Sequence, residues 1–131
     1  MMPQAPPAIE SAFANASAKT GVPVSVLREM ARKESSFNPN ATNPSGAQGL
    51  FQFMPATAKQ YGVNVSDPNS SALGAATYIK QLQSQFGGSL SNALAAYNWG
   101  PGNLQKYGMQ NAPPETQHYV STIMGNLGAG Y

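Results

Sequence analysis

The sequence contains no cysteine, one histidine and, among its 131 residues, only seven basic and five acidic side chains. Without cysteine the chain has no disulfides, no thiolate metal site and no cysteine nucleophile. A single histidine, His118, and a single aspartate, Asp67, are too few for a metal centre, and nothing brings them together in a Ser-His-Asp triad. We therefore expect no metal and no cofactor, and interpret His118 as a surface or supporting residue.

Long apolar runs, basic clusters and an export signal are also missing. No window approaches the roughly 18 apolar residues of a membrane span, and no run of Lys or Arg predicts a nucleic-acid partner. The GPG segment at residues 100–102 lacks the lysine of a phosphate-binding loop. The first seven residues have neither a basic start nor an apolar stretch. We expect either a protein that works without general export or one whose leader has been removed.

Neutral polar side chains take the place of charge. The chain carries 11 Asn, 10 Gln and 13 Ser, whose amides and hydroxyls can exchange hydrogen bonds with uncharged hydroxyl groups. This composition suits a sugar ligand but does not demonstrate one. The length is that of one domain, and we expect a monomer.

Helical periodicity and capping signals predict a mostly α domain over residues 9–131, preceded by a flexible segment at residues 1–8. The expected helices cover residues 9–19, 25–34 with Ser25 as N-cap, 55–60, 68–86, about 90–99 with Ser89 or Ser91 as N-cap, and 114–127. Residues 38–49 are dense in Asn, Pro, Ser and Gly and predict an ordered loop with at most a short strand pair. The GPG segment is expected to break the chain after the fifth helix.

Glu34 is the most informative acidic residue. It extends the stripe formed by Leu27, Met30 and Ala31 on the buried face of its helix. A carboxyl group against apolar neighbours has its charged form disfavoured, so we expect its pKa to be raised. A general acid needs that shift to carry its proton at neutral pH. The alternative is a glutamate at a helix end that is partly exposed and paired with an arginine.

The other acidic residues have simpler interpretations. Asp67 is expected to cap the helix that follows it, and Glu29 to lie among basic residues on an outward face. Glu10 lies near an end that we expect to be unanchored, and Glu115 suits the first turn of the last helix through the helix dipole. Glu34 is therefore the one strong acid candidate, and Glu115 is the only carboxylate that could be its partner.

Aromatic residues flank the loops, where the faces of sugars could stack on them. They are Phe51, Phe53, Tyr97 and Trp99. Taken singly, each residue of this kind is more often part of a core.

Four motifs, in this order, resemble those of the soluble, goose-lysozyme-like lytic transglycosylases. They are ESSFNP at residues 34–39, GAQGLFQFMP at 46–55, AYNWGPG at 96–102 and ETQHYV at 115–120, and together with their spacing they cover residues 9–127. The resemblance implies a mostly α, lysozyme-like single domain of about six to seven helices, with a loop or minimal hairpin after the catalytic helix.

The resemblance also assigns roles to individual residues. It makes Glu34 the single catalytic acid and base. The residues that it implies as glycan ligands are Asn43, Gln52, Met54, Tyr97, Asn98 and Trp99, and those that it implies as supporting residues are Ser35, Glu115 and Tyr119. Asn43 departs from the family, which often has serine there, and Trp99 replaces a usual small residue. We expect altered geometry from Asn43, and an added stacking surface from Trp99.

The implied reaction cleaves the β-1,4 bond between N-acetylmuramic acid and N-acetylglucosamine in peptidoglycan. Protonated Glu34 would donate to the glycosidic oxygen, and the N-acetyl group of the substrate would stabilise the oxocarbenium-like centre. Glu34 would then take the proton of the muramoyl C6 hydroxyl, which closes a 1,6-anhydro ring because that nucleophile is already tethered to the reacting sugar. Two alternatives stay open: a hydrolytic muramidase with Glu115 as base, and a non-catalytic glycan-binding module.

The sequence also leads to expectations about the biological context. The partners implied are peptidoglycan glycan strands, with no nucleic acid and no membrane span. A short domain without a recognisable leader suits a phage-encoded or secretion-associated enzyme that acts on the cell wall, in the periplasm or outside the cell.

Overall fold

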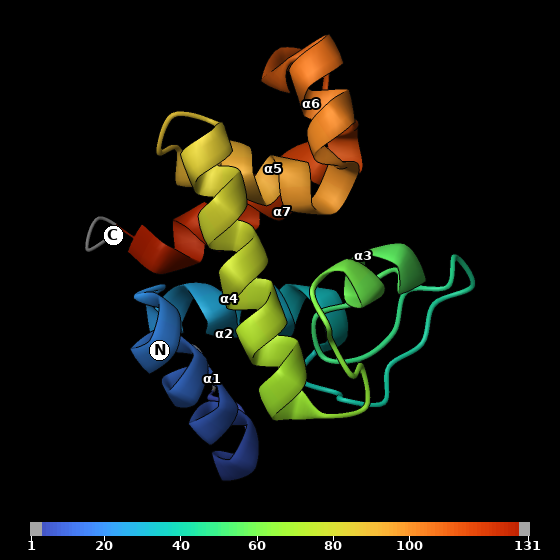
Figure 1. The fold of residues 1–131 in the computed structure, drawn as a ribbon. Helices are drawn as coiled ribbons and strands as arrows, with labels where there is room; N and C mark the ends of the chain where they lie inside the picture. The colour runs from blue at the N-terminus through green and yellow to red at the C-terminus, as the bar shows by residue number, and fades with distance from the viewer. Residues whose placement is uncertain (1–3, 129–131) are drawn as a thin grey trace. The chain divides into compact units, whose positions relative to one another are not determined.

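The computed structural model describes residues 4–128, which form helices joined by loops (Figure 1). The elements are α1 (Pro7–Thr20), α2 (Val24–Ser35), α3 (Pro55–Gln60), α4 (Pro68–Gln85), α5 (Leu90–Trp99), α6 (Pro101–Tyr107), the 3-10 turn η1 (Met109–Asn111) and α7 (Pro114–Leu127). Two isolated antiparallel bridges, Thr42 with Gln48 and Gln48 with Phe53, lie in the loop after α2. The predicted mostly α fold with a minimal hairpin is confirmed.

The chain forms two compact units, residues 1–77 and 78–131, and the division falls inside α4. In the first unit α1 packs against α2, and in the second α5 packs against both α6 and α7 (Figure 1). None of the helices in the described part is long and apolar enough to cross a membrane. The domain boundaries predicted from sequence, residues 1–8 and 9–131, stay a prediction, and residues 1–3 lie outside the described range.

The core of the first unit forms around Phe13 of α1. Its ring centroid lies 6.0 Å from that of Phe51, in an edge-to-face arrangement, and 6.4 Å from that of Phe37. Because burial of such a side chain contributes about 1.5–3 kcal/mol, Phe51 anchors the loop after α2 to this core. Phe51 and Phe53 are both buried, which rules out the suggestion that sugars stack on them.

An ion pair that the sequence did not predict holds the start of α1. Arg28 donates from Nε and Nη2 to the two carboxylate oxygens of Glu10, at 2.9 and 2.7 Å, and the backbone N–H of Ala5 donates to the same carboxylate at 3.0 Å. The hydrogen bonds from Arg28 lower the pKa of Glu10 below its ordinary value. The prediction that Glu10 lies near an unanchored end is wrong, and α1 begins at Pro7, two residues before its predicted start.

Two predictions about α2 are also wrong. Pro23 is its N-cap and no side chain caps it, so Ser25 does not have the predicted role. Glu29 is buried, with 6% of its surface exposed, and does not lie on an outward face. Arg32, three residues later, reaches back over it with Nη2 3.2 Å from the carboxylate, so the negative charge is paired where it is removed from water.

The remaining helix ends follow the predicted signals, with one exception. Asp67 accepts a hydrogen bond from the backbone N–H of Asn69, and Ser89 accepts one from that of Asn92, so both are confirmed as N-caps. Gly100, with φ of 105°, ends α5, but Pro101 starts a new helix at once. The sequence analysis missed α6 because it interpreted the GPG segment only as a break.

The second unit owes its close helix packing to small side chains. Ala93, Ala95 and Ala96 of α5 are fully buried together with Leu94. Because alanine takes little space, α6 and α7 can both pack on this helix. Tyr119, Val120 and Ile123 cover the facing side of α7 and are buried as well.

Candidate active site

Glu34 lies in the last turn of α2, and its side chain is half-buried. The stripe before it is as predicted, since Leu27, Met30 and Ala31 are all fully buried. The next residue ties this turn to the following loop: the hydroxyl of Ser35 lies 2.7 Å from the carbonyl oxygen of Leu50 and 3.1 Å from that of Ala31. Ser35 therefore holds the end of the helix against the second motif.

Backbone strain gathers in the first two motifs. Among the described residues, three other than glycine have positive φ: Ser36 at 52°, Phe37 at 66° and Gln52 at 53°. For a residue with a side chain this conformation costs on the order of 1–2 kcal/mol. Such strain is retained where the surrounding structure imposes it, and it is concentrated at functional sites. The two strained segments follow Glu34 and contain the predicted glycan ligand Gln52.

Gln52 is fixed by the loop in which it lies. Its Nε2 donates to the carbonyl oxygens of Gly49, at 2.8 Å, and Ala41, at 3.2 Å. Both amide hydrogens are thus used within the protein, which leaves Oε1 as the group that a ligand can contact. In this geometry Gln52 can accept a hydrogen bond from a sugar hydroxyl.

Gly49 allows the loop of the second motif to approach the backbone of Val65 closely. It has φ of 84°, and a Cβ atom at this position would collide with the backbone carbonyl oxygen of Val65. Its backbone N–H donates to Ala41 at 2.8 Å, across the base of the loop. Only glycine meets both conditions, the positive φ and the absence of a side chain.

Asn43 and Met54 lie on the exposed side of the same loop. The Oδ1 of Asn43 accepts from the backbone N–H of Ser45 at 2.9 Å, which closes a tight turn and leaves its Nδ2 able to donate. Met54 is 44% exposed, and its sulfur lies 4.0 Å from the hydroxyl of Ser45. The loop thus presents an amide donor and an apolar thioether to solvent.

In the second unit, the third and fourth motifs are joined by a hydrogen bond. The hydroxyl of Thr116, which is 2% exposed, donates to Oδ1 of Asn98 at 2.8 Å. This bond ties the last turn of α5 to the first turn of α7. Tyr97 is half-buried, and its ring lies 5.4 Å from that of Tyr78. The structure therefore brings the predicted ligands Tyr97 and Asn98 to the same end of the unit as the start of α7.

Trp99 has an aromatic partner that the sequence analysis missed. Its ring centroid lies 6.0 Å from that of Tyr107 at the end of α6, with an angle of 32° between the planes. Tyr107 is 48% exposed, and Lys106 holds its ammonium nitrogen 5.2 Å from the ring centroid of Tyr107. The signal that could have identified Tyr107 was its place at the end of a helix that Pro101 begins.

The predicted supporting residues of α7 differ in exposure. Tyr119 is 3% exposed, whereas Glu115 is exposed in the first turn and forms no hydrogen bond or ion pair with another described residue. His118 is exposed, in agreement with its interpretation as a surface residue. Within residues 4–128, no three acidic or histidine side chains gather as metal ligands would. The roles of Glu115 and Tyr119 stay predictions.

Comparison with known proteins agrees with the resemblance. The family model described as the transglycosylase SLT domain matches residues 11–120. The chain belongs to this family. It is 34% identical over 116 residues to a transglycosylase of Enterobacteria phage PRD1, a match that covers 86% of this chain and 43% of the relative. It is 33% identical over 97 residues to the soluble lytic murein transglycosylase of Escherichia coli, covering 66% of this chain and 15% of that protein.

A solved structure shows the same fold. An inactive Glu→Gln mutant of the lytic transglycosylase Slt from Pseudomonas aeruginosa superposes with a TM-score of 0.75 at 26% identity, covering 86% of this chain and 22% of that one. The lysozyme-like, goose-type fold class predicted from the motifs is thereby confirmed. The chain spans less than half the length of these relatives.

Proposed function

We propose that the chain is a peptidoglycan lytic transglycosylase in which Glu34 acts first as general acid and then as general base. The observation that carries this proposal is the environment of Glu34. It is half-buried at the end of α2, and the segments tied to it hold three non-glycine residues at positive φ. Ser36 ends α2 as its left-handed C-cap, and strain of this kind clusters at functional sites, where it helps to preorganise them. The inactive Glu→Gln mutant of the Pseudomonas relative supports a reaction that depends on one glutamate.

The chemistry divides between a positioned carboxyl group and the substrate itself. Glu34 donates its proton to the glycosidic oxygen, while the N-acetyl group of the substrate stabilises the positive charge that develops at the anomeric carbon. Glu34, now a carboxylate, removes the proton of the muramoyl C6 hydroxyl, and that oxygen closes the 1,6-anhydro ring. No second carboxylate is needed, because the nucleophile belongs to the reacting sugar.

The loop of the second motif supplies polar contacts of fixed direction. Gln52 presents Oε1 as an acceptor because its Nε2 is held by backbone carbonyls. Asn43 presents Nδ2 as a donor because its Oδ1 closes the turn. Met54 offers apolar contact to a sugar face. We expect Asn43→Ser to be tolerated, since a hydroxyl can close the same turn more weakly.

The third and fourth motifs supply further contacts to the glycan. Asn98 is oriented by Thr116, and Tyr97 is packed against Tyr78. Trp99, with Tyr107 beside it, offers an aromatic surface on which a sugar ring can stack. Glu115 and Tyr119 act as supporting residues, as the family resemblance implies.

The muramidase alternative is not favoured. It needs a base to activate water, and Glu115, the only candidate, is exposed in the first turn of α7. The relatives are named as transglycosylases, one encoded by a phage and one acting on murein. We therefore infer that the protein acts on the cell wall as a monomer, in the periplasm or outside the cell, and in a phage or secretion context.

The experiment is digestion of purified peptidoglycan by the protein and by Glu34→Gln. We expect the protein to release muropeptides and Glu34→Gln to release none, while its thermal unfolding and its sedimentation with peptidoglycan are unchanged. Lys33→Gln, at the neighbouring exposed position of the same helix, serves as the matched control and should retain turnover. Activity of Glu34→Gln, with the fold intact, would remove Glu34 from the reaction.

A further inference from the structure

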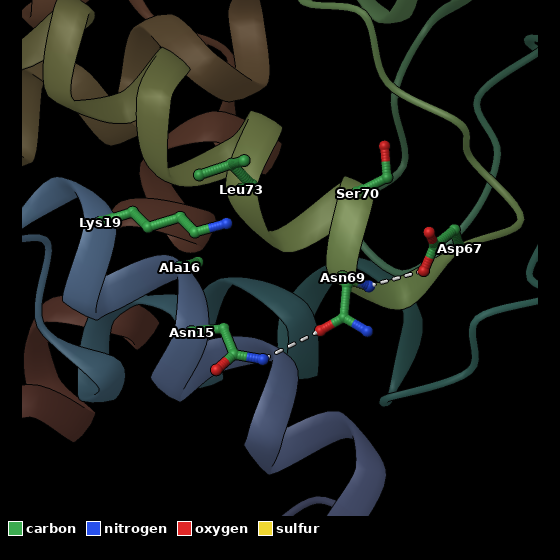
Figure 2. Close-up of a pocket in the computed structure, with 7 residues that line it drawn as sticks. All are labelled: Asn15, Ala16, Lys19, Asp67, Asn69, Ser70 and Leu73. Atoms are coloured by element: carbon green, nitrogen blue, oxygen red, sulfur yellow. Dashed lines mark hydrogen bonds between the residues drawn. The ribbon is translucent and has the colours of Figure 1, made fainter.

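The first unit contains a cavity to which the sequence analysis assigned no role. Its volume is about 570 Å³, which falls within the range of small-molecule sites. It lies between the C-terminal half of α1 and the first turns of α4 (Figure 2). It is lined by Asn15, Ala16, Lys19, Asp67, Asn69, Ser70 and Leu73. None of these residues belongs to the four motifs.

The two charges that line this cavity, Lys19 and Asp67, are not paired with each other. The two ion pairs described above, Glu10 with Arg28 and Glu29 with Arg32, involve neither of them. Lys19 is exposed and forms no ion pair with a residue in the range 4–128, and Oδ1 of Asp67 accepts the hydrogen bond that caps α4. The cavity therefore offers one cation and one carboxylate that are not paired with each other. A ligand that carries both an anionic and a cationic group complements them.

The amides in the cavity complement a peptide bond. Figure 2 shows Asn15 and Asn69 reaching toward each other, and Nδ2 of Asn15 donates to Oδ1 of Asn69 at 3.4 Å. This bond is long and exposed, so little free energy is lost when a ligand replaces it. The opposite ends of the pair, Oδ1 of Asn15 and Nδ2 of Asn69, are an acceptor and a donor. Those are the groups required by the N–H and C=O of a peptide.

The apolar part of the lining is small. Ala16 is only 1% exposed, so the apolar surface that a ligand can contact comes mainly from the half-buried Leu73. No aromatic side chain is present for a sugar to stack on. Ser70 accepts a hydrogen bond from the backbone N–H of Asn64 at 2.8 Å, which leaves its own hydroxyl hydrogen for a ligand. The lack of an aromatic face among the lining residues, together with the charges of Lys19 and Asp67, favours a charged peptide over a neutral glycan.

We propose that this cavity binds the short peptide stem of peptidoglycan, with Lys19 on a stem carboxylate, Asp67 on a stem amino group and the two asparagines on its peptide bonds. This rests on the proposed function, since peptidoglycan is the polymer that carries such peptides next to the glycan to be cleaved. The contact would add affinity for strands that bear stems without taking part in the chemistry.

The test uses a synthetic stem tetrapeptide of alanine, isoglutamate, diaminopimelate and alanine, titrated into the labelled protein and followed by NMR. We expect saturable shifts of the side-chain amide signals of Asn15 and Asn69. Lys19→Gln should weaken binding by about fivefold, the size of one exposed ion pair, and Lys19→Arg should restore it. Lys59→Gln is the matched control, because Lys59 is likewise exposed in the last turn of a helix but lies outside the cavity.

The same tetrapeptide with its C-terminal carboxylate converted to an amide sharpens the test. The amide peptide should bind the protein more weakly than the free-acid peptide does. The loss of affinity caused by Lys19→Gln should be smaller for the amide peptide than for the free acid. Asn69→Ala, which retains the helix cap, should reduce the affinity for both peptides. Absence of saturable shifts, an equal effect of Lys59→Gln, or the same shifts with stem-free glycan strands would overturn the proposal.

The outcome is independent of the proposed reaction. Peptide binding is measured without turnover and should be unchanged in Glu34→Gln. If anhydro products form but the peptide does not bind, only the cavity assignment is wrong. If the peptide binds at the cavity but peptidoglycan is not cleaved, the proposed reaction is wrong and the peptide site stands.

Discussion

Replacing Gly49 with alanine tests whether the loop of the second motif depends on the close approach seen at this residue. Alanine at φ of 84° costs about 1–2 kcal/mol in backbone conformation. The new methyl group also collides with the carbonyl oxygen of Val65, which is backbone and cannot rotate away, and overpacking of this kind costs about 1–3 kcal/mol. We therefore expect Gly49→Ala to lower the free energy of unfolding by about 2–5 kcal/mol.

Gly46→Ala is the matched control in the same loop. Gly46 has φ of 100°, but a Cβ atom there would meet nothing closer than 3.9 Å, so only the backbone cost of about 1–2 kcal/mol applies. At roughly 4 °C per kcal/mol for a domain of this size, Tm should fall by about 4–8 °C for Gly46→Ala and about 8–20 °C for Gly49→Ala. Circular dichroism during heating, with urea unfolding for the free energies, measures both.

Activity gives a second comparison between the two variants. The carbonyl oxygen of Gly49 accepts from the side chain of Gln52 at 2.8 Å and from its backbone N–H at 3.2 Å, so a shift of Gly49 also turns Gln52. At a temperature where both variants are folded, muropeptide release should fall further for Gly49→Ala. Equal losses of stability in the two variants would refute the close approach to Val65 and the account of the loop built on it.

Three further perturbations test other contacts. Ser35→Ala removes the 2.7 Å hydrogen bond from the end of α2 to Leu50 in the second motif and should lower the free energy of unfolding by about 1 kcal/mol. The relative loss of turnover should be larger than that of stability, as measured by a peptidoglycan digest and by urea unfolding. Thr116→Val leaves Oδ1 of Asn98 without its donor and should cost about 1–3 kcal/mol, whereas Thr122→Val, on the same helix, should cost less than half as much. Because Arg28 lowers the pKa of Glu10, this ion pair stabilises the folded state fully above the ordinary glutamate pKa of about 4.3, and the stabilisation is lost as pH falls through the lower pKa of the folded state. Glu10→Gln should therefore reduce the loss of unfolding free energy on acidification. An acid profile equal to that of the unchanged protein would contradict this.

Local signals predicted most of the helices. Proline at a first turn marked α3, α4 and α7, and Ser89 marked α5, because these caps act within three or four residues of chain. The apolar stripe of α2 also predicted that Glu34 follows a buried face. In each case the physical cause lies within one helix, so a single stretch of sequence contains it.

Contacts between distant segments escaped prediction. Glu10 and Arg28 are 18 residues apart, and their pairing depends on how α1 packs against α2. Glu29 was assigned to solvent because its neighbours are basic, although the same arginine that suggested exposure is the partner that permits burial. Trp99 was recognised as unusual, but its partner Tyr107 lies on the helix that was missed. The candidate site was thus predicted by motif and residue type, and its supporting contacts required the structure.

The central claim, that the reaction closes a ring on the substrate and does not add water, is tested most directly by digesting peptidoglycan in water that carries heavy oxygen. Mass spectrometry of the released muropeptides then reports both the product and the source of its oxygen. The account predicts anhydro-muramoyl ends, lighter than reducing ends by one water and free of the label, and no release by Glu34→Gln. Reducing ends that carry heavy oxygen would show that water is the nucleophile and would contradict it.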